Sequence, residues 1–472
     1  MSSADRPNIL VIMSDEHTAS VMGCYGNEIA QTPTMDRLSA DGIAFDCAYT
    51  NSPLCVPARL AFTAGKYVSR VGAWSNSTWL PSDDMPSLPR SMNAAGYESF
   101  LCGKMHYDKI RRYGFTDILP DAYTNNYHKT GRGKRRAADD ETINTKNRDG
   151  RFANFHPGDN SDVLDHDREV TDRAVEFLAG RERSDKPFFL LAGYLSPHFP
   201  LIVPEKYWQT YKGRVPMPVL PPGNVESQPL NYHHLRRGFG VVETDPAIVR
   251  KGRELAYGLT QWLDDEMAKV LAALASSEAA DNTVVIYTTD HGENMGDHHL
   301  WWKNNMYDHS ARVPLIVSWP ARWASGQRRT GVCSLADVVQ TIVELGGGQP
   351  GDDWDGDSLC AWMDDETAEW KDSAISEYYA HNICSGFVMY RQGQYKYVYH
   401  TPADDDHPPE RELYDMVADP GEFTNLSSAP EHAEQMARMH EAMVAELGEH
   451  PDQTEQRCRA DYARGYGRPG PA

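Results

Sequence analysis

The chain has 472 residues, of which 40% are hydrophobic. This length is enough to bury a sizeable core, and since single cores rarely grow past about 250 to 300 residues, it predicts one large and one smaller domain. The 68 acidic and 46 basic residues give a formal net charge of -22, which repels nucleic-acid phosphates and anionic membranes and disfavours a polyanion-binding role. Small anionic substrates are compatible with this charge, because Lys, Arg, His and metal can reverse the potential inside one cleft.

The start of the chain and its cysteines indicate a compartment. Neither a basic segment nor a cleavage-site pattern precedes the first apolar stretch, so we expect no signal peptide. No later apolar run reaches the length of a bilayer-spanning helix. The eight cysteines lie far apart without a Cys-x-x-Cys pair, which is typical of a reducing compartment rather than of a disulfide framework. We therefore expect a soluble, cytoplasmic protein that contacts neither membranes nor nucleic acid.

Continuous apolar runs predict three buried strands. They cover residues 8–13, 187–195 and 283–289, and polar residues follow each of them. Two stretches between them, 168–180 and 250–275, have apolar residues at helical spacing. Alternating strands and helices predict an α/β fold with a mostly parallel sheet flanked by helices, in which ligands bind beyond the carboxyl ends of the strands.

The pattern changes after about residue 350 to short, alternating segments. Residues 386–391 and 395–400 predict an antiparallel hairpin, and a helix is expected over 429–447. We therefore expect a large domain over residues 1–350 and a smaller antiparallel domain over 351–450. The polar tail over 451–472 cannot form a core by itself, and we expect it either to be disordered or to contact another subunit of a homo-oligomer.

Residues 121–165 are polar and carry a cluster of basic side chains, which are Arg132, Lys134, Arg135 and Arg136. Such a charge run is common in a solvated loop, but a loop of this length can also line the mouth of a substrate site. The sequence leaves both interpretations open.

Acidic residues follow two of the predicted strands. Asp15 and Glu16 come after the first strand, and Asp290 and His291 come after the third. Their carboxylate oxygens and imidazole are ligands that divalent cations take in proteins. Each pair by itself is explained as well by capping of the next helix, but their matching positions favour a metal site.

The segment from Cys55 to Gly65 predicts a helix that begins close to the cysteine, with Pro57 in its first turn. Backbone N–H groups at such a helix start attract anions. From this pattern alone, Cys55 would be a small buried hydrophobic residue more often than a nucleophile.

This segment resembles a motif of type I sulfatases, Cys-x-(Pro/Ala/Ser)-x-Arg followed by Thr-Gly, in which the cysteine is oxidised to formylglycine. Here it reads Cys55-Val56-Pro57-Ala58-Arg59, with Thr63-Ala64-Gly65 after it. Further motifs resemble the family in the same order, and they are Gly103-Lys104-Met105-His106, Pro197-His198, Thr289-Asp290-His291-Gly292, Leu300-Trp301-Trp302-Lys303, residues 310–315 and residues 412–426. The chain is most similar to the choline sulfatase and phosphonate monoester hydrolase branch. This resemblance implies an alkaline phosphatase-like α/β sandwich with a small C-terminal antiparallel sheet and helix.

The resemblance also implies a sulfuric ester hydrolase of the arylsulfatase type, acting on aryl or small alkyl sulfates through a covalent sulfo-enzyme intermediate. A formylglycine-generating enzyme would convert Cys55 into the nucleophile. One divalent ion, Ca²⁺ or Mn²⁺, would be bound by Asp15, Glu16, residue 55, Asp290 and His291. Glu16 departs from the Asp or Gln that is more familiar in the family, so it is either a direct ligand or a residue behind the ligands.

The remaining motif residues receive roles in the transfer by the same resemblance. Arg59, Lys104 and Lys303 would surround the sulfuryl oxygens, His198 or Lys303 would protonate the leaving alcohol, and His106 would deprotonate the second hydroxyl of the formylglycine hydrate. Outside these motifs, the two lysines would be ordinary surface residues. Asn76 either contacts the substrate, as an asparagine of the phosphonate hydrolase branch does, or only forms a turn.

Three other functions stay open. A phosphonate monoester or phosphodiester hydrolase would use the same nucleophile, but that branch has Tyr and Thr where this chain has Lys104 and His106, which favours sulfate esters. A silent relative that only binds an anion would require Cys55 to remain a thiol. Choline sulfate would require a cage for its quaternary ammonium, for which Trp74, Trp79 and Tyr123 are candidates.

Overall fold

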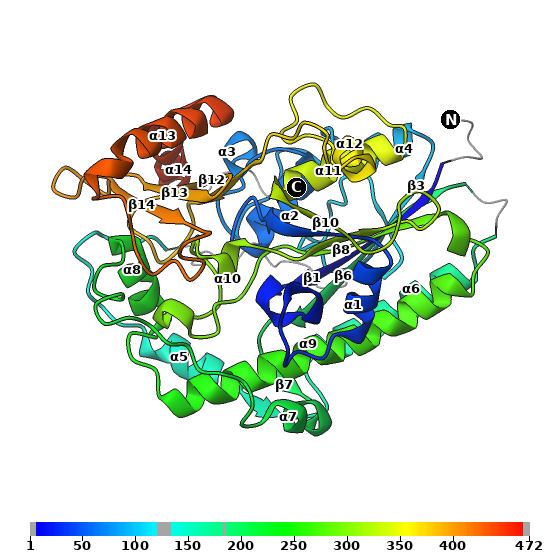
Figure 1. Ribbon diagram of the computed structural model, residues 1–472, viewed down its shortest axis with the longest axis horizontal. Coiled ribbons are helices and arrows are strands. Elements are labelled where there is room, and N and C mark those ends of the chain that lie inside the picture. Colours follow the sequence, from blue (N-terminus) through cyan, green and yellow to red (C-terminus); the bar gives the residue numbers. More distant parts are fainter. Residues whose placement is uncertain (1–5, 120–133, 183–185, 466–472) are drawn as a thin grey trace.

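The computed structural model describes residues 6–119, 134–182 and 186–465. Its centre is an eight-stranded sheet with the order β10-β2-β9-β8-β1-β6-β3-β4 (Figure 1). The strands are β1 Asn8–Asp15, β2 Ile43–Tyr49, β3 Glu98–Gly103, β4 Thr116–Asp117, β6 Phe188–Pro197, β8 Thr283–Thr289, β9 Leu315–Ser318 and β10 Gln327–Ser334. Within this described sheet β9 alone runs antiparallel to its neighbours. The predicted α/β fold with a mostly parallel sheet is confirmed.

The three strands predicted from apolar runs are β1, β6 and β8, which lie side by side in the middle of the sheet. All residues of β6 and β8 are buried, and in β1 only Asn8 is partly exposed. The register is parallel, and Met13 lies beside both Gly193 and Thr288. The polar residues that follow these strands therefore meet at one end of the sheet.

Helices cover both faces of this sheet. Because successive residues of a strand point to opposite faces, Leu10 and Ile12 face α1 (Pro33–Ala40), α6 (Asp162–Ala179) and α9 (Pro246–Ala275). Ile9 and Val11 face α2 (Cys55–Ala64), α4 (Leu88–Ala94) and α11 (Leu335–Leu345). Figure 1 shows α6 and α9 below the sheet and α2 and α11 above it. The helices predicted over 168–180 and 250–275 correspond to α6 and α9.

Shorter elements connect these layers. They are α3 (Val68–Val71), α5 (Thr145–Phe152), α7 (Glu205–Tyr211), α8 (Leu230–Phe239), α10 (Asp308–Ala311), α12 (Cys360–Asp364) and the paired strands β5 (His156–Pro157) and β7 (Ile202–Val203). Among the helices of the described ranges, none combines the length and the apolar character that crossing a bilayer requires.

A second sheet is built from the C-terminal part of the chain. Its four antiparallel strands follow the order β11 (Ser373–Tyr378), β12 (Phe387–Gln392), β13 (Tyr395–His400) and β14 (Glu410–Asp415). The predicted hairpin is β12 and β13, in which Tyr390 pairs with Tyr397. The predicted helix is α13 (Ala433–Leu447), and its Met439 and Met443 pack against this sheet.

Part of the tail forms a helix that packs in the cluster of the C-terminal sheet, so the expected disorder is wrong for this part. Residues Pro451–Ala463 form α14, and Cys458 of this helix is fully buried in the same cluster as Met439. The sequence of this helix is polar even at a buried position. Its buried Glu455 is held by an ion pair with Arg135 rather than by apolar packing. Residues 466–472 lie outside the described ranges.

Candidate active site

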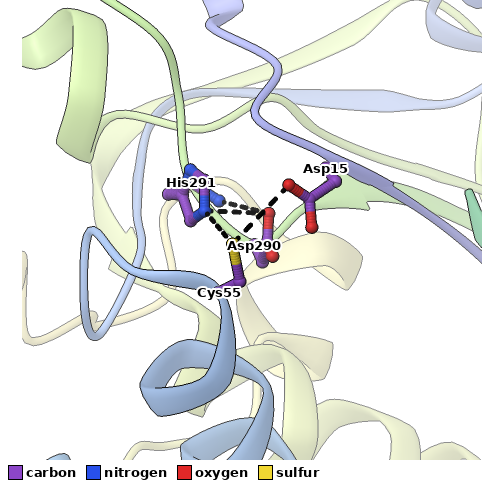
Figure 2. Close-up of side chains that lie close together, drawn as sticks. All are labelled: Asp15, Cys55, Asp290 and His291. Carbon is purple, nitrogen blue, oxygen red and sulfur yellow. Dashed lines mark hydrogen bonds and ion pairs between the residues drawn. The ribbon is translucent and has the colours of Figure 1, made fainter. Parts of the chain in front are cut away.

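Four side chains that the sequence analysis assigned to a metal meet at the end of the central strands. Asp15 ends β1, Asp290 and His291 follow β8, and Cys55 is the first residue of α2 (Figure 2). The Sγ atom of Cys55 lies 3.7 Å from Oδ1 of Asp15 and 3.1 Å from Nε2 of His291. One potential ligand atom from each of the four lies within 4.8 Å of the others, and all four residues are buried.

The start of α2 holds Cys55 in this position. Leu54 is extended and caps the helix only through its carbonyl oxygen, which accepts the N–H of Ala58. The N–H of Val56 donates to Oδ1 of Asn76 at 3.1 Å, so this orphan donor is satisfied by a side chain from another segment. Asn76 also lines the cavity described below. It therefore supports the helix start and stays a candidate for contact with substrate.

Arg59 is fully buried one turn into α2 and binds both carboxylates of the cluster. Its Nε lies 2.7 Å from Oδ2 of Asp290, and one terminal nitrogen lies 3.0 Å from Oδ2 of Asp15. The other acceptors of its N–H groups are the carbonyl oxygens of Ser14 and Lys104 and the sulfur of Met105. Since a guanidinium has five N–H groups, this set engages all of them. In this arrangement Arg59 orients the two carboxylates, and its contact with the sulfuryl oxygens, which the resemblance implies, stays a prediction.

The two lysines of the site are buried, so neither is an ordinary surface residue. Lys104 follows β3 and its ammonium is ion-paired with Asp15. Lys303 donates to Oε2 of Glu16 at 2.9 Å. Burial opposes the charged form of Lys303, but the neighbouring Cys55, Glu16 and Asp15 outweigh it and raise the pKa of this lysine. Both side chains therefore supply fixed positive charge beside Cys55.

Two histidines complete the predicted set. Nε2 of His198 lies 3.3 Å from Oε2 of Glu16, and its Nδ1 contacts the carbonyl oxygen of Phe199. His106 lines the cavity and is nearly buried, with a left-handed φ of 59°. Burial, reinforced by Lys303 for His198 and by Lys104 for His106, lowers the pKa of both imidazoles well below their usual range. Both rings are therefore neutral near pH 7 in this arrangement.

Burial and the neighbouring charges have opposite effects on the pKa values of Asp15 and Cys55. Burial opposes ionisation of Asp15, but the charges of Lys104 and Arg59 lower its pKa well below the usual range. Burial and the Asp15 charge raise the pKa of the Cys55 thiol to about 12. An unmodified cysteine is therefore protonated at neutral pH, and a protonated thiol is a poor nucleophile.

Glu293 was missed by the sequence analysis. Its Oε1 accepts the N–H groups of Met295 and Trp302 at 2.8 and 2.6 Å. Burial raises the pKa of Glu16 to about 8. The charge of Glu293 adds to this rise, and Lys303 opposes it. The available signal was its place one residue after the motif Asp290-His291-Gly292, which adds another carboxyl group to the same strand end.

The residues present fit a divalent cation. Two carboxylates and a neutral imidazole form the donor set, and burial lowers the pKa of His291, which favours the neutral form that binds metals. Asp15 also belongs to a second group with Glu16 and His198. Among the described residues, nothing donates to Oε1 of Glu16, which is a buried oxygen beside this set. A cation would satisfy that oxygen.

A cavity of about 950 Å³ opens above Cys55. Its wall includes His106, His198 and Lys303, and also Lys134, Arg135 and Arg136. The described part of the basic segment in the polar stretch 121–165 therefore lines this cavity, while Arg132 lies outside the described residues. Tyr123, one of the proposed cage residues, also lies outside them, and neither Trp74 nor Trp79 is part of this cavity wall.

Comparison with known proteins adds independent evidence. The family model described as Sulfatase matches residues 7–348, and the model described as N-sulphoglucosamine sulphohydrolase, C-terminal, matches residues 296–449. A choline-sulfatase of Rhizobium meliloti (strain 1021) is 30% identical over 453 residues, which cover 90% of this chain and 83% of that protein. An uncharacterized sulfatase, YidJ, of Escherichia coli (strain K12) is 28% identical over 450 residues, covering 93% and 86%.

The fold is shared with solved structures as well. The crystal structure of a phosphonate monoester hydrolase of Agrobacterium radiobacter superposes with a TM-score of 0.76 at 21% identity, covering 94% of this chain and 96% of that one. At this identity the likeness concerns the fold, and the family follows from the sequence matches. The chain belongs to the sulfatase family, within the alkaline phosphatase superfamily.

Proposed function

We propose that this sulfatase hydrolyses aryl or small alkyl sulfate monoesters with a formylglycine made from Cys55 as its nucleophile. The observation that carries the proposal is the position of Cys55. It lines the cavity together with Lys303, His106 and His198, and it lies within the cluster of Asp15, Asp290 and His291 that fits a metal. The raised pKa of the Cys55 thiol supports a modified residue, because the unmodified side chain is poorly suited to attack.

The proposed formylglycine hydrate has two hydroxyl groups, one for attack on sulfur and one whose deprotonation expels sulfate. A divalent cation would be held by Asp15, Asp290, His291 and residue 55, with Glu16 as a further carboxylate. It would supply positive charge for oxygens that become anionic. Its identity, Ca²⁺ or Mn²⁺, is a matter for experiment, since oxygen ligands suit both and an imidazole suits Mn²⁺.

The chain's own residues have separate tasks in this proposal. Lys104 and Lys303, both charged and buried, stabilise negative charge on the sulfuryl oxygens. Nδ1 of His198 donates to a backbone carbonyl oxygen, so in the neutral ring Nε2 carries no proton, and the leaving alcohol takes its proton from the ammonium of Lys303. His106 is neutral and accepts the proton from the remaining hydroxyl of residue 55. Arg59 keeps Asp15 and Asp290 in place.

Phosphonate monoester or phosphodiester hydrolysis is the nearest alternative, because a similar charge cluster accommodates both transfers. The burial of Lys104 and His106 at the site supports sulfate, since the phosphonate branch that the sequence resembles has Tyr and Thr there. Maturation by a formylglycine-generating enzyme, a cytoplasmic location and self-association are further proposals from the sequence.

A turnover assay tests this function. The protein is expressed with a formylglycine-generating enzyme, the state of residue 55 is read by peptide mass spectrometry, and rates are measured with 4-nitrophenyl sulfate, choline sulfate, phenyl phosphonate esters and phosphodiesters. We expect the sulfate esters to react fastest and Cys55→Ala to lose turnover while keeping its melting temperature. A modified protein that hydrolyses no sulfate ester, or a Cys55→Ala variant with near wild-type rates, would contradict the proposal.

A further inference from the structure

The cavity above Cys55 has a basic wall in a strongly acidic protein. Its charged lining residues are the basic Lys134, Arg135, Arg136, Lys146, Arg151 and Lys303 against the acidic Asp140 and Asp162. The whole chain has a formal net charge of -22, so the sign is locally reversed. A concave wall of one sign concentrates ions of the other sign. Lys303 and the other residues close to Cys55 bind the one sulfate group that reacts. The remaining basic residues of the wall have no role in that step.

Four of these basic residues have partners within the described ranges, and for Lys303 and Arg151 these include Glu16 and Asn147. Arg135 forms a buried ion pair with Glu455 of α14, and Arg136 lies 3.1 Å from Asp140. By contrast, Lys134 and Lys146 are exposed and form no ion pair with any residue of the described ranges. Lys134 and Lys146 thus add positive charge to the wall that ion pairs within the described ranges do not neutralise.

Arg151 is a further basic residue of this wall. Its guanidinium carbon lies 4.1 Å from the ring centre of Phe199, 4.2 Å from that of Trp302 and 5.3 Å from that of Phe239. Its Nε donates to Oδ1 of Asn147 one turn earlier in α5, at 3.1 Å. Stacking uses the flat faces of a guanidinium, whereas its N–H groups lie in the plane and match the two oxygens of a carboxylate or sulfate. Arg151 is therefore held among aromatic rings on the cavity wall, and a guanidinium has the donor geometry that such anions bind.

The position of Arg151 relates it to the leaving alcohol. The ring of Phe199, which Arg151 contacts, also stacks on His198 with ring centres 4.3 Å apart. Lys303 lies 5.6 Å from the centre of the same ring. Since Lys303 is the proposed proton donor to the leaving alcohol, we expect the part of the substrate that departs to lie near Phe199.

We infer that the alcohol part of the substrate carries a second anionic group, a carboxylate or another sulfate, and that Arg151 binds it with Lys134 and Lys146. This inference rests on the proposed hydrolysis of sulfate monoesters at residue 55. It also bears on choline sulfate, the substrate in the name of one relative. The aromatic rings that would cage a quaternary ammonium already hold the guanidinium of Arg151, and a second cation there would be repelled.

Aryl sulfates that differ only in one meta substituent test the inference. The enzyme with verified formylglycine is assayed with phenyl sulfates bearing a carboxylate, a sulfonate, a neutral carboxamide or a trimethylammonium group. We expect kcat/KM for the carboxylate or the sulfonate to exceed that for the carboxamide about tenfold, the effect of one charge-assisted hydrogen bond, and the trimethylammonium ester to be slowest. The faster of the two anions identifies a planar or a tetrahedral group as the preferred partner.

The anion preference, expressed as a ratio of kcat/KM values, is then measured in variants. Arg151→Gln should bring the ratio of anionic to neutral ester close to one, and Lys134→Gln combined with Lys146→Gln, at exposed positions, should lower it in part. Arg148→Gln is the matched control, because Arg148 lies on the same helix, pairs with Asp149 and does not line the cavity. The ratio does not depend on the amount of folded enzyme.

Two outcomes overturn the inference in distinguishable ways. The first outcome is a wild type that hydrolyses the neutral ester without preferring the anionic ones, or a preference that survives in both the Arg151 and the lysine variants. In that case Arg151 does not bind an anionic group of the substrate, and the proposed sulfatase function stands. If modified wild type hydrolyses none of the esters, the proposed function itself fails, and this inference fails with it.

Discussion

Arg59 of α2 and Asp290 at the end of β8 form a buried ion pair, with Nε 2.7 Å from Oδ2. The same guanidinium binds Asp15 at the end of β1. One residue therefore connects the helix that begins with Cys55 to two adjacent strands of the central sheet. The carboxylates of Asp15 and Asp290 have oxygens within 4.8 Å of one another and repel each other. Arg59 neutralises part of their charge before any cation binds.

Arg59→Gln should be strongly destabilising, because it leaves the buried Asp290 without its counter-charge and leaves Asp15 with Lys104 alone. Removal of one partner from a buried ion pair costs about 3–5 kcal/mol. The free energy of unfolding is measured with urea in the absence of divalent metal. Arg37→Gln is the control, since its pair with Asp41 is largely exposed, and such pairs contribute about 0–1 kcal/mol. Equal costs for the two variants would contradict the role of Arg59.

The sequence was sufficient for those parts of the fold that depend on local apolar patterns. The runs from Ile9 to Met13 and from Val284 to Thr289 are apolar or weakly polar because both faces of their strands are buried, and this pattern gives the strand ends directly. Since parallel strands end on one side of the sheet, the meeting of Asp15 with Asp290 was predictable too.

Other features depend on contacts between distant segments. Helix α5 has no apolar face, and its Arg151 packs on aromatic rings more than forty positions later in the chain, at Phe199 and Trp302. Helix α14 has a polar sequence, and the burial of its Glu455 depends on an ion pair with Arg135 of a distant segment. The engagement of Arg59 with both carboxylates likewise follows only from the positions of all its acceptors.

Addition of Ca²⁺ or Mn²⁺ should raise the melting temperature of the metal-stripped protein. The reason is that a cation binding only the folded state stabilises it in proportion to the logarithm of its concentration over Kd. Asp290→Asn should lose most of this shift. Asp264→Asn is a matched control, because Asp264 is buried but binds backbone N–H groups of α1 away from the cluster. Shifts of equal size in both variants would exclude Asp290 as a ligand.

His106→Ala should separate release of the alcohol from release of sulfate. If His106 acts only after the alcohol has left, rapid mixing of the variant with 4-nitrophenyl sulfate should show one equivalent of nitrophenol followed by slow turnover. His407→Ala, at an exposed position, should behave like the wild type. The absence of any burst, or steady turnover at the wild-type rate, would contradict the role of His106 as the late base.

The pH dependence of kcat should reflect the neutral state of His106. Burial, reinforced by the Lys104 charge, lowers its pKa well below the usual range. A base is active when deprotonated, so its contribution is lost only as pH falls through this lowered pKa. We therefore expect no loss of kcat assignable to His106 between pH 8 and pH 6.5, with an acid limb below that range. An acid limb centred near pH 6.5 that disappears in His106→Asn would show an unshifted histidine.

Glu377 of β11 should make the protein less stable as pH rises towards 8. Burial raises its pKa from 4.5 to about 7, although the N–H of Ser69, 3.0 Å from Oε2, opposes this rise. The folded state therefore binds more protons than the unfolded state between these values, and the stability that this adds below pH 4.5 declines as pH rises through 7. Since one pKa unit corresponds to about 1.4 kcal/mol, the loss is on the order of 3 kcal/mol.

Glu377→Gln removes this titration while keeping an acceptor for Ser69. Its melting temperature relative to the wild type should therefore rise between pH 5 and pH 8, because only the wild type acquires a buried charge. Glu434→Gln, at an almost fully exposed position, should follow the wild type at both pH values. Parallel pH profiles for the wild type and Glu377→Gln would show that Glu377 ionises as readily in the folded state as in the unfolded chain.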